Sequence, residues 1–383
     1  MKLIHTADIH IGMENYGRLD PETGLSSRLQ DFLKAYDAMV DYAVQEKADY
    51  FIFSGDAFKT REPTPTHLRE FAKRIRRLAK AGIEVALLVG NHDTGNAAGK
   101  ANTLDIYSAL ETEHVHVIRE PELVTVKGLQ VVGIPWVSRA EFATVHDKIK
   151  SLFKEVNPTQ PAIVMAHASV SGAKYGSERA VMMGGDFVLD KNVLDNPKIS
   201  YVALGHIHQR QVITGTKVPM VYSGSLERVD FGEAKEDKGF EVVELKDTAG
   251  KWRATHQHIS TNPRNFVEIK VDLTKDGANP TQEVIEAIGK HDVKDAVVKV
   301  IINVPPECAH DVDVAAIRHA LRDSFFIAAI SKNISRVTRE TLGETPEELS
   351  PLQALERYFT AKKVDGKRSK HLRELARELL EMS

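Results

Sequence analysis

The sequence predicts an α/β fold divided into more than one domain, and three observations lead to this prediction. Short apolar runs typical of strands alternate with longer amphipathic runs typical of helices over residues 1–262. The chain has 383 residues, of which 42% are hydrophobic and 27% are charged, so it can bury a large core and form two or three domains. Several strand-like runs lead directly into short polar motifs, as expected where an open α/β sheet binds ligands at the carboxyl ends of its strands.

The expected elements follow one another in a regular order. In the first part of the chain we expect strands at 2–6, 50–53, 85–89, 162–166 and 201–204, and helices at 27–45, 65–81, 103–110 and 140–155. The pattern restarts at residue 263 as a small β-α-β-α-β module, with strands at 266–271, 296–304 and 325–330 and helices at 281–290 and 312–324. We therefore expect one domain over residues 1–262 and a second over residues 263–336.

The last part of the chain, residues 337–383, differs from both. A polar, acid-rich run at 340–350 is typical of a linker, and two short amphipathic helices are expected at 351–359 and 370–382. Two short helices on a tether bury little apolar surface by themselves. We therefore expect them to dock on their own chain or on another protein.

Five short motifs supply the kinds of side chain that could hold two metal ions. Asp8 and His10 lie two residues apart after the first strand, where an extended backbone would point both to the same side. Gly55 would let the chain turn sharply and leave Asp56 at the edge of the sheet. The other four candidate ligands also follow expected strands: Asn91, His167, His206 and His208.

These side chains predict a two-metal site for phosphate chemistry. Two divalent ions about 3.5 to 4 Å apart can bind a phosphate and activate a water for in-line attack, and they need a bridging carboxylate, for which we choose Asp56. The mixture of oxygen and nitrogen donors suits manganese, iron or zinc better than magnesium or calcium. The single cysteine, Cys308, lies far from every motif in the sequence.

His92 and Asp93 directly follow Asn91 and are candidate catalytic residues. An imidazole beside two cations can donate a hydrogen bond to a phosphoryl oxygen or protonate the departing oxygen. Asp93 is expected to orient the His92 ring.

Taken together, the five motifs resemble the calcineurin-like metallophosphoesterases, whose fold is a sandwich of two mixed β-sheets flanked by helices. Residues 222–228 (YSGSLER), followed by DFGE at 230–233 and KGF at 238–240, resemble the signature of the SbcD and meiotic-recombination-eleven nucleases. The resemblance implies that Asp8, His10, Asp56 and His208 hold one ion, that Asp56, Asn91, His167 and His206 hold the other, and that His92 acts on the substrate. Lys59 departs from archaeal and eukaryotic relatives, which carry a histidine at that place, and favours the bacterial SbcD branch.

The same resemblance implies an activity and partners. It implies a manganese-dependent nuclease, with magnesium, iron or zinc as alternative ions, that acts as a 3'-5' exonuclease and as a single-strand or hairpin endonuclease in DNA double-strand-break repair and recombination. It implies a homodimer formed through helices of the phosphoesterase domain, and a capping domain at 263–336 that helps to choose the DNA substrate. The helices at the carboxyl end would bind an SbcC-type, Rad-fifty-like ABC ATPase.

The charge of the chain neither requires nor excludes DNA. The net charge is −3, but phosphate contacts need only a local basic surface and are independent of base sequence. Most of the candidate cations lie near a metal motif in the sequence, and each could equally well be a solvated surface charge: Arg18, Lys59, Arg61, Lys174, Arg179 and Arg228.

Cysteine usage and the terminus predict the compartment. One cysteine excludes an internal disulfide framework and favours a reducing cytoplasm. The amino terminus lacks the apolar region of an export signal, and no apolar run approaches the roughly 20 residues that a membrane span needs. We therefore expect a cytoplasmic, nucleoid-associated protein without a membrane segment. Among the remaining histidines, His5 is expected to pack on its strand, and His67, His256 and His258 to be solvated.

Two other functions would use part of this pattern. A phosphoesterase for small phosphomonoesters or cyclic nucleotides would need the same ligands but neither the second module nor the tethered helices. A non-catalytic scaffold that bridges DNA and an ATPase would have no reason to fill every ligand position.

Overall fold

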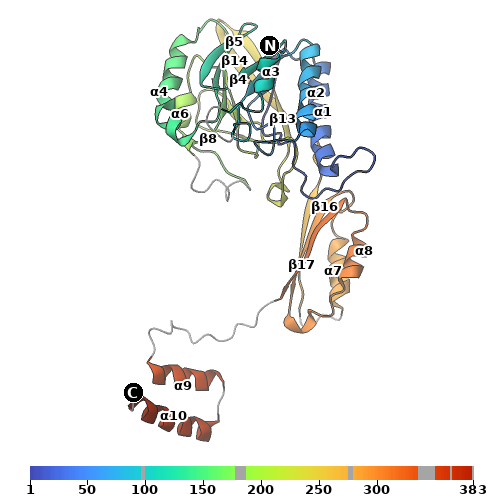
Figure 1. Cartoon of the computed structure of the whole chain (residues 1–383), viewed down its shortest axis with the longest axis vertical. Coiled ribbons are helices and arrows are strands. Elements are labelled where there is room, and N and C mark those ends of the chain that lie inside the picture. The colour runs from blue at the N-terminus through green and yellow to red at the C-terminus, as the bar shows by residue number, and fades with distance from the viewer. Residues whose placement is uncertain (96–99, 177–186, 275–278, 335–349, 363–364, 382–383) are drawn as a thin grey trace.

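The computed structural model describes residues 1–95, 100–176, 187–274, 279–334, 350–362 and 365–381. It shows a large α/β body, a smaller α/β module and a pair of helices that follow one another along the chain (Figure 1). The body contains two six-stranded sheets, each of mixed strand direction. The predicted α/β class, a sandwich of two mixed sheets flanked by helices, is confirmed.

The first sheet has the strand order β14-β13-β1-β2-β3-β4. Its strands are β1 (Lys2–Thr6), β2 (Tyr50–Phe53), β3 (Glu84–Leu88), β4 (Val115–Ile118), β13 (Gly239–Thr248) and β14 (Lys251–Ser260). Strands β1 to β4 are parallel, and the β13–β14 hairpin pairs with β1 in antiparallel orientation. Because the parallel strands share one direction, the loops at their carboxyl ends gather at one edge of the sheet.

The second sheet has the strand order β11-β12-β10-β7-β6-β5. Its strands are β5 (Glu122–Val126), β6 (Leu129–Ile134), β7 (Ala162–His167), β10 (Tyr201–Gly205), β11 (Gln211–Val212) and β12 (Met220–Tyr222). Strands β6, β7, β10 and β12 are parallel, and the two edge strands are antiparallel to their neighbours. A separate two-stranded pair is formed by β8 (Ser169–Val170) and β9 (Val188–Leu189).

The two sheets pack face to face, and helices cover their outer faces (Figure 1). Leu3 and Leu88 of the first sheet share one buried cluster with Ile163 and Ala203 of the second. The outer face of the first sheet is covered by α1 (Ser27–Gln45), α2 (Pro65–Lys80) and α3 (Asp105–Ala109). The outer face of the second is covered by α4 (Arg139–Glu155) and α6 (Lys191–Leu194).

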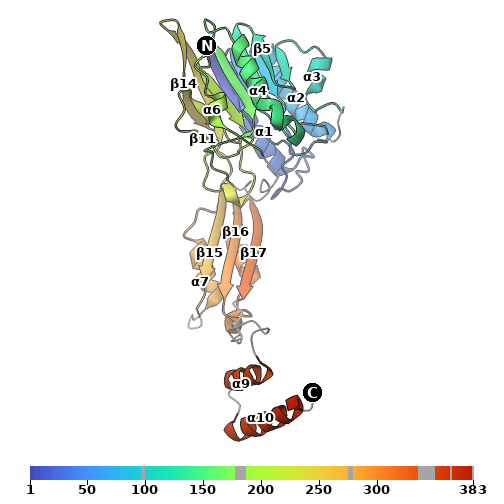
Figure 2. The ribbon, with the colours of Figure 1, turned by 90° about the vertical axis from the view of Figure 1, so that its left-hand side faces the viewer.

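The module is a three-stranded parallel sheet with two helices (Figure 2). Its elements are β15 (Phe266–Asp272), α7 (Pro280–Ile288), β16 (Val297–Val304), α8 (Val314–Ala320) and β17 (Phe326–Ile334). The order β-α-β-α-β is as expected, but α8 is shorter than the expected helix over 312–324. Its start is set by Asp313, whose carboxylate accepts hydrogen bonds from the backbone N–H groups of Ala315 and Ala316.

The module is joined to the body by aromatic and ionic contacts. The Tyr16 ring lies edge-on to the rings of Phe231 and Phe266, at centroid distances of 5.5 and 5.7 Å. The Arg264 guanidinium donates two hydrogen bonds, of 2.7 and 2.6 Å, to the carboxylate of Asp31 on α1. A bidentate pair of this kind fixes orientation as well as distance.

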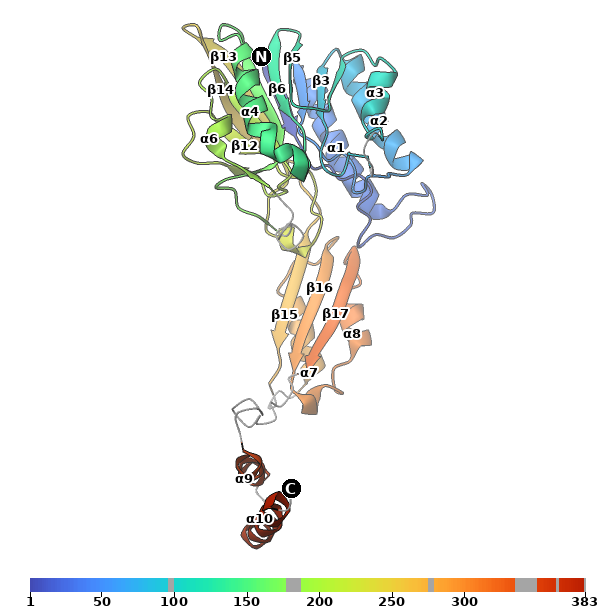
Figure 3. The ribbon, with the colours of Figure 1, turned by 60° about the vertical axis from the view of Figure 1, so that its left-hand side comes forward.

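Two further helices, α9 (Pro351–Ala361) and α10 (Gly366–Glu381), form a pair near the end of the chain (Figure 3). Ser350 caps α9 through a reciprocal hydrogen-bonded pair with Gln353, and Arg373 on α10 makes a 2.8 Å ion pair with Glu356 on α9. Residues 335–349, which contain most of the expected linker, lie outside the described residues, so the expected domain boundaries stay predictions. No helix in the described part of the chain is long and apolar enough to cross a membrane.

Candidate metal centre

The candidate ligands come from loops at the carboxyl ends of five strands that lie near one another in the two sheets. Asp8 and His10 follow β1, Asp56 follows β2 and Asn91 follows β3 in the first sheet. In the second sheet, His167 ends β7, and His206 and His208 follow β10, its hydrogen-bonded neighbour. Each of the seven side chains makes or approaches a contact with another of the set, so the motifs that the sequence singled out converge at one place.

The backbone at these loops is unusual. Asp8, His10, Asp56 and His206 have φ angles of 52°, 48°, 62° and 97°, in the left-handed region that costs roughly 1 kcal/mol or more for a residue other than glycine. The expectation that Asp8 and His10 lie in extended backbone is therefore wrong. Hydrogen bonds from the Asp8 N–H to Gly55 O and from the His10 N–H to Asp56 O hold the two loops together instead.

Two glycines make this close approach of the loops possible. Gly55 has a φ of +97°, as its predicted role in a sharp turn requires, and a Cβ there would collide with the His167 ring. A Cβ at Gly90 would collide with the Asp56 carboxylate. The strain at Asp56 is thus tolerated because its neighbours leave space for its backbone and side chain.

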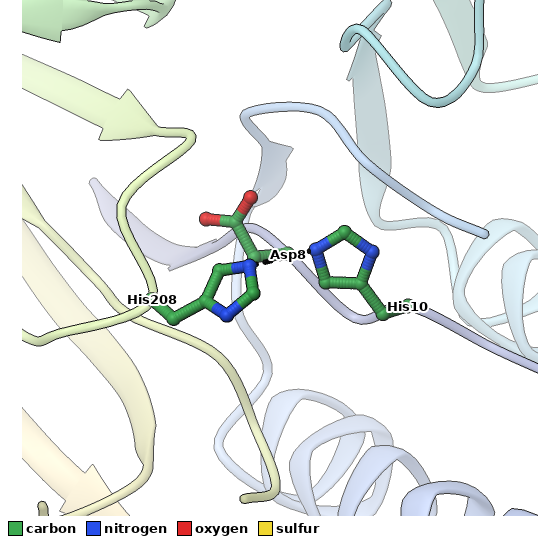
Figure 4. Close-up of side chains that lie close together, drawn as sticks. All are labelled: Asp8, His10 and His208. Atoms are coloured by element: carbon green, nitrogen blue, oxygen red, sulfur yellow. Dashed lines mark hydrogen bonds between the residues drawn. The ribbon is translucent and has the colours of Figure 1, made fainter. Parts of the chain in front are cut away.

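One group of ligand atoms is formed by Asp8, His10 and His208, which lie within 4.8 Å of one another (Figure 4). The Nε2 atoms of His10 and His208 face each other at 2.9 Å. The His10 Nε2 atom is also 3.8 Å from Asp56 Oδ2. Imidazole nitrogens that converge beside carboxylates form a donor set that suits a transition-metal ion or zinc.

The second group is formed by Asp8, Asp56 and His167, again within 4.8 Å of one another. Asn91 Oδ1 is 2.9 Å from His167 Nε2 and 3.0 Å from His206 Nδ1, which brings the amide and both rings to the same group. Asp56 Oδ1 lies 3.5 Å from His167 Nε2, whereas the other oxygen, Oδ2, faces His10. One oxygen of Asp56 is therefore directed at each group, which is the arrangement that a bridging carboxylate needs.

Burial and neighbouring charges together set the protonation of this cluster. Burial and the neighbouring His208 lower the pKa of His10 to about 3, so its ring is neutral and able to bind a metal ion at neutral pH. Burial opposes the charge on His167, but the nearby Asp56 carboxylate outweighs it and raises the pKa of His167 to about 9. A cation bound here would displace that proton, because only the neutral imidazole is a ligand.

Contacts behind the ligands hold the rings in place. The Nδ1 atoms of His10 and His167 contact the carbonyl oxygens of Phe58 and Ser54 at 3.3 and 2.7 Å. The Nδ1 atom of His208 is 2.8 Å from Glu233 Oε1. In each of these three rings the other nitrogen, Nε2, is left facing the cluster, as metal-binding histidines require.

Glu233 is a positioning residue that the sequence analysis missed. Its side chain is fully buried, and its second oxygen lies 2.9 Å from the Nζ atom of Lys238, which is also fully buried. Glu233 is the last residue of the DFGE motif, which resembles part of the SbcD signature. Only the folded chain, however, brings its carboxylate to the His208 ring.

Replacing Glu233 with glutamine is expected to weaken metal binding by about 10 to 100-fold, because His208 loses the carboxylate that fixes its orientation and raises its basicity. Titration of the metal-free protein with Mn²⁺ by calorimetry measures this effect. Glu236→Gln is the matched control, since Glu236 contacts Lys238 at 2.7 Å, whereas the carboxylate at 2.8 Å from the His208 ring is that of Glu233. Equal losses in the two variants would mean that Glu233 acts only through Lys238.

The structure gives Asp93 a different role from the expected one. Its buried carboxylate accepts hydrogen bonds of 2.8, 3.0 and 2.9 Å from the backbone N–H groups of Asp56, Ala57 and Gly90. Burial and the negative charge of Asp56 raise its pKa to about 7. Asp93 therefore ties the loop after β2 to the loop after β3, and the expectation that it orients the His92 ring is wrong.

His92 lies at the edge of the cluster and is partly exposed. Its ring is 5.2 Å from the His10 ring, at an interplanar angle of 88°, and it shares a group of possible ligand atoms with His10 and Asp56. Its backbone N–H donates a 2.8 Å hydrogen bond to Asp56 Oδ1. This partly exposed position leaves the ring available to a substrate phosphate.

The six candidate DNA contacts are placed very differently. Arg61 is exposed, and its Nε atom donates a 3.0 Å hydrogen bond to the carbonyl of Asn91, directly beside the cluster. Lys59 is partly buried on the same loop, and Arg18 is exposed above the Phe326 ring of the module. Lys174 is exposed, and its backbone contacts Gln211. Arg179 lies outside the described residues.

The structure gives Arg228 a structural role, and the expectation that it contacts DNA stays a prediction. Its guanidinium is partly buried and donates to four backbone carbonyls, those of Glu233, Glu236, Pro263 and Arg264, at 2.7 to 3.3 Å. The N–H groups of its guanidinium thus hold backbone segments of the same chain. Arg228 thus connects the start of the module with the loop that carries Glu233.

Some of the other histidines are more buried than expected. His5 is fully buried and contacts the Tyr201 hydroxyl at 3.0 Å, in keeping with its predicted packing. The expectation of solvated rings is wrong for three others. His67 contacts Glu14, and His256 and His258 both contact the buried Glu241 carboxylate, at 2.7 and 3.4 Å.

Comparison with known proteins agrees with this geometry. A family model described as calcineurin-like phosphoesterase matches residues 1–210. A DNA double-strand break repair protein Mre11 from Archaeoglobus fulgidus is 26% identical over 315 residues, which are 76% of this chain and 66% of that protein. A subunit of the nuclease SbcCD from Bacillus subtilis is 26% identical over 269 residues, which are 64% of this chain and 66% of that protein. The matched part therefore spans just under two thirds of each relative.

Among solved structures, a dimetal phosphatase from Danio rerio is similar at a TM-score of 0.43, with 10% sequence identity over 68% of this chain and 99% of that chain.

Proposed function

Because this chain belongs to the calcineurin-like phosphoesterase family, we propose that it is a metal-dependent DNA nuclease that processes double-strand breaks. The observation that carries the chemistry is the position of Asp56, with one carboxylate oxygen directed at each of two groups of buried ligands. DNA as the substrate is supported by the signature at 222–240 and by the relatives named as a double-strand break repair protein and as part of a nuclease.

The ligand sets are proposed as follows. Asp8, His10, Asp56 and His208 would hold one ion, and Asp56, Asn91, His167 and His206 the other. When bound, a pair of divalent ions supplies Lewis-acid activation of the scissile phosphate and of an attacking water. The donor set of imidazole, carboxylate and amide favours manganese, with iron, zinc or magnesium as alternatives.

The remaining residues act on the phosphodiester itself. His92 can donate a hydrogen bond or a proton to the departing oxygen, because its ring is partly exposed beside the cluster. Arg61 and Lys59 lie on the loop that follows Asp56, where positive charge would attract the DNA backbone without regard to base sequence. Hydrolysis by a directly attacking water requires no covalent intermediate. We propose that the protein acts both as a 3'-5' exonuclease and as an endonuclease. It would do so with Lys59 at the position where archaeal and eukaryotic relatives carry a histidine.

A comparison of substrates tests this proposal. Purified protein with Mn²⁺ is expected to cleave a hairpin or linear oligonucleotide with a higher kcat/KM than a small aryl phosphodiester. Hydrolysis of the aryl ester without cleavage of DNA would instead identify a small-molecule phosphoesterase. Absence of hydrolysis of either substrate at full metal occupancy would identify a scaffold.

We also propose that α9 and α10 dock on an SbcC-type ATPase. Both helices present exposed apolar side chains: Tyr358 is 51% exposed, Leu375 42% and Leu379 68%. Large apolar side chains gathered on a surface mark a place where a partner binds. The homodimer that the resemblance implies is a separate proposal, and the exposed Ile106 and Leu110 at α3 support an apolar contact there.

Truncation after residue 339 removes α9 and α10, which contain none of the proposed metal ligands. Metal-dependent nuclease activity should therefore stay within about twofold of that of the full chain. Binding of the ATPase should be abolished, because the proposed docking surface is lost. Co-purification with the tagged ATPase measures binding. Leu379→Glu in the full-length chain should reproduce the loss, whereas Glu374→Ala on the same helix should not. Retained co-purification of the truncated chain would contradict the docking proposal.

A further inference from the structure

A cavity remote from the metal centre has the features of a ligand site. It has a volume of about 700 Å³ and is lined by four segments of the chain, at residues 158–160, 197–200, 217–219 and 250–254. We call it the Trp252 pocket. Ser200, in its lining, directly precedes β10, whose opposite end leads to His206. The length of that strand, five residues at about 3.3 Å each, separates the pocket from the metal centre by roughly 17 Å.

The charge of the Trp252 pocket is one-sided. Four basic residues and no acidic residue are among those that line it: Lys198, Lys217, Lys251 and Arg253. In a chain with a net charge of −3, a cavity with this lining attracts anions locally.

Three of these cations are free to meet a ligand. The Lys198 ammonium has a structural role, since it donates 2.9 Å hydrogen bonds to the carbonyls of Phe153 and Val156 at the end of α4. Lys217, Lys251 and Arg253 are exposed, and within the described ranges none of them forms an ion pair. The nearby Asp195 carboxylate accepts the backbone N–H groups of Lys217 and Val218 and so stabilises the loop.

The pocket also contains an aromatic side chain, that of Trp252, which is held in place by contacts with neighbouring segments. The Trp252 side chain is partly exposed, and its Nε1 atom is 3.4 Å from the carbonyl of Thr159. The Ser200 hydroxyl donates a 3.1 Å hydrogen bond to the Trp252 carbonyl and thereby connects the two sheets. Three of the lining residues are prolines, whose φ angles are fixed by their rings: Pro158, Pro197 and Pro219.

We propose that the Trp252 pocket binds a nucleoside phosphate group, with the base at the indole on the inner face of β14 and the phosphate at the rim. Positive charge is supplied there by Lys217 and by Lys251 and Arg253, which alternate with Trp252 and leave β14 on its outer face. An aromatic face beside basic side chains is the combination that binds single-stranded nucleic acid without sequence preference. The same chemistry is offered by a free nucleotide and by a short stretch of single-stranded DNA. This site goes beyond the proposed nuclease function, because it lies at the far end of the sheets and its occupancy requires no hydrolysis.

Intrinsic fluorescence can report on this pocket alone. The chain has two tryptophans, Trp136 and Trp252, so the Trp136→Phe variant of the full-length, metal-loaded protein emits only from the pocket. We would titrate it with a phosphorothioate oligothymidylate of about ten nucleotides, which resists cleavage, with thymidine monophosphate and with inorganic phosphate. We expect saturable quenching by at least one of the two thymidine ligands and none by inorganic phosphate.

The comparison of ligands identifies the source. Tighter binding of the oligonucleotide would assign the pocket to single-stranded DNA, and equal or tighter binding of the mononucleotide would assign it to a free nucleotide. Absence of quenching by both thymidine ligands, or equal quenching by inorganic phosphate, would overturn the proposal. If a separate assay found no nuclease activity, the assignment of the pocket would still stand, because quenching is measured without turnover.

Charge reversal supplies the second arm of the experiment. Lys251→Glu and Arg253→Glu are each expected to weaken the thymidine ligand about tenfold and to reduce the salt dependence of its affinity by about one phosphate contact. Both side chains are exposed, so thermal unfolding should be unchanged, as should turnover of a small aryl phosphodiester. Lys290→Glu, at an exposed site in the module, is the matched control. An equal loss in that control would mean that only general electrostatic attraction is involved, and it would refute the pocket.

Discussion

Replacing Asp56 with asparagine is expected to lower phosphodiesterase turnover by more than about 100-fold and to reduce bound metal from two ions to one or none per chain. Replacing a residue that only orients a metal ligand lowers metal affinity or activity by about 10 to 100-fold. The effect at Asp56 should be larger, because Asp56 is proposed to bind both ions directly. An amide presents one neutral oxygen where the carboxylate presents two charged ones. Elemental analysis of the metal-saturated, desalted variant, together with a nuclease assay, measures both effects.

Asp147→Asn is a matched control for this substitution, because the Asp147 side chain on α4 is 87% exposed and far from the ligands in sequence. It should retain two ions and full turnover. Two ions per chain in the Asp56 variant, with turnover intact, would remove the basis for a bridged pair.

The second large effect is expected at His92. Replacing it with asparagine should reduce turnover by about 10² to 10⁴-fold, the usual contribution of a general acid, while two metal ions remain bound. The His92 ring is near His10 and Asp56, so metal content separates two roles for the ring. A loss of metal along with activity would make His92 a ligand and would contradict its assignment as a proton donor.

His291→Asn is a suitable companion, because His291 is an exposed histidine in the module. The turnover of the His291→Asn variant should match that of the unmodified chain. A substrate with a better leaving group, such as a nitrophenyl ester, should be less affected by His92→Asn than DNA is, since it needs less protonation of the departing oxygen.

The strands and the convergence of the ligands were predictable because they depend on local patterns. An apolar run that ends in a polar motif defines the end of a strand, and parallel neighbours bring such ends to one edge. Helix α1 begins and ends at the expected residues, 27 and 45, since its apolar spacing ends there as well. The left-handed backbone of Asp8 and His10 was not predictable, because partners in a distant loop, Gly55 and Asp56, hold it.

Side-chain roles were less predictable than side-chain positions. Asp93 follows His92 in sequence, yet three N–H groups from two loops bind its carboxylate. Arg228 is the last residue of the YSGSLER motif, yet its neighbours are carbonyl oxygens from the body and the start of the module. Such partners come from tertiary packing, which no local pattern of residue types records.

The donors of Arg228 have a mechanical consequence for catalysis. One edge of the guanidinium holds the carbonyls of Pro263 and Arg264, where the module begins, and its Nε atom donates to the carbonyl of Glu233, whose carboxylate contacts the His208 ring. Any force that tilts the module is therefore transmitted in part through the Arg228 side chain to a metal-facing imidazole. A load applied to the module, far from the cluster, would be felt there as a change in the positions of the donor atoms.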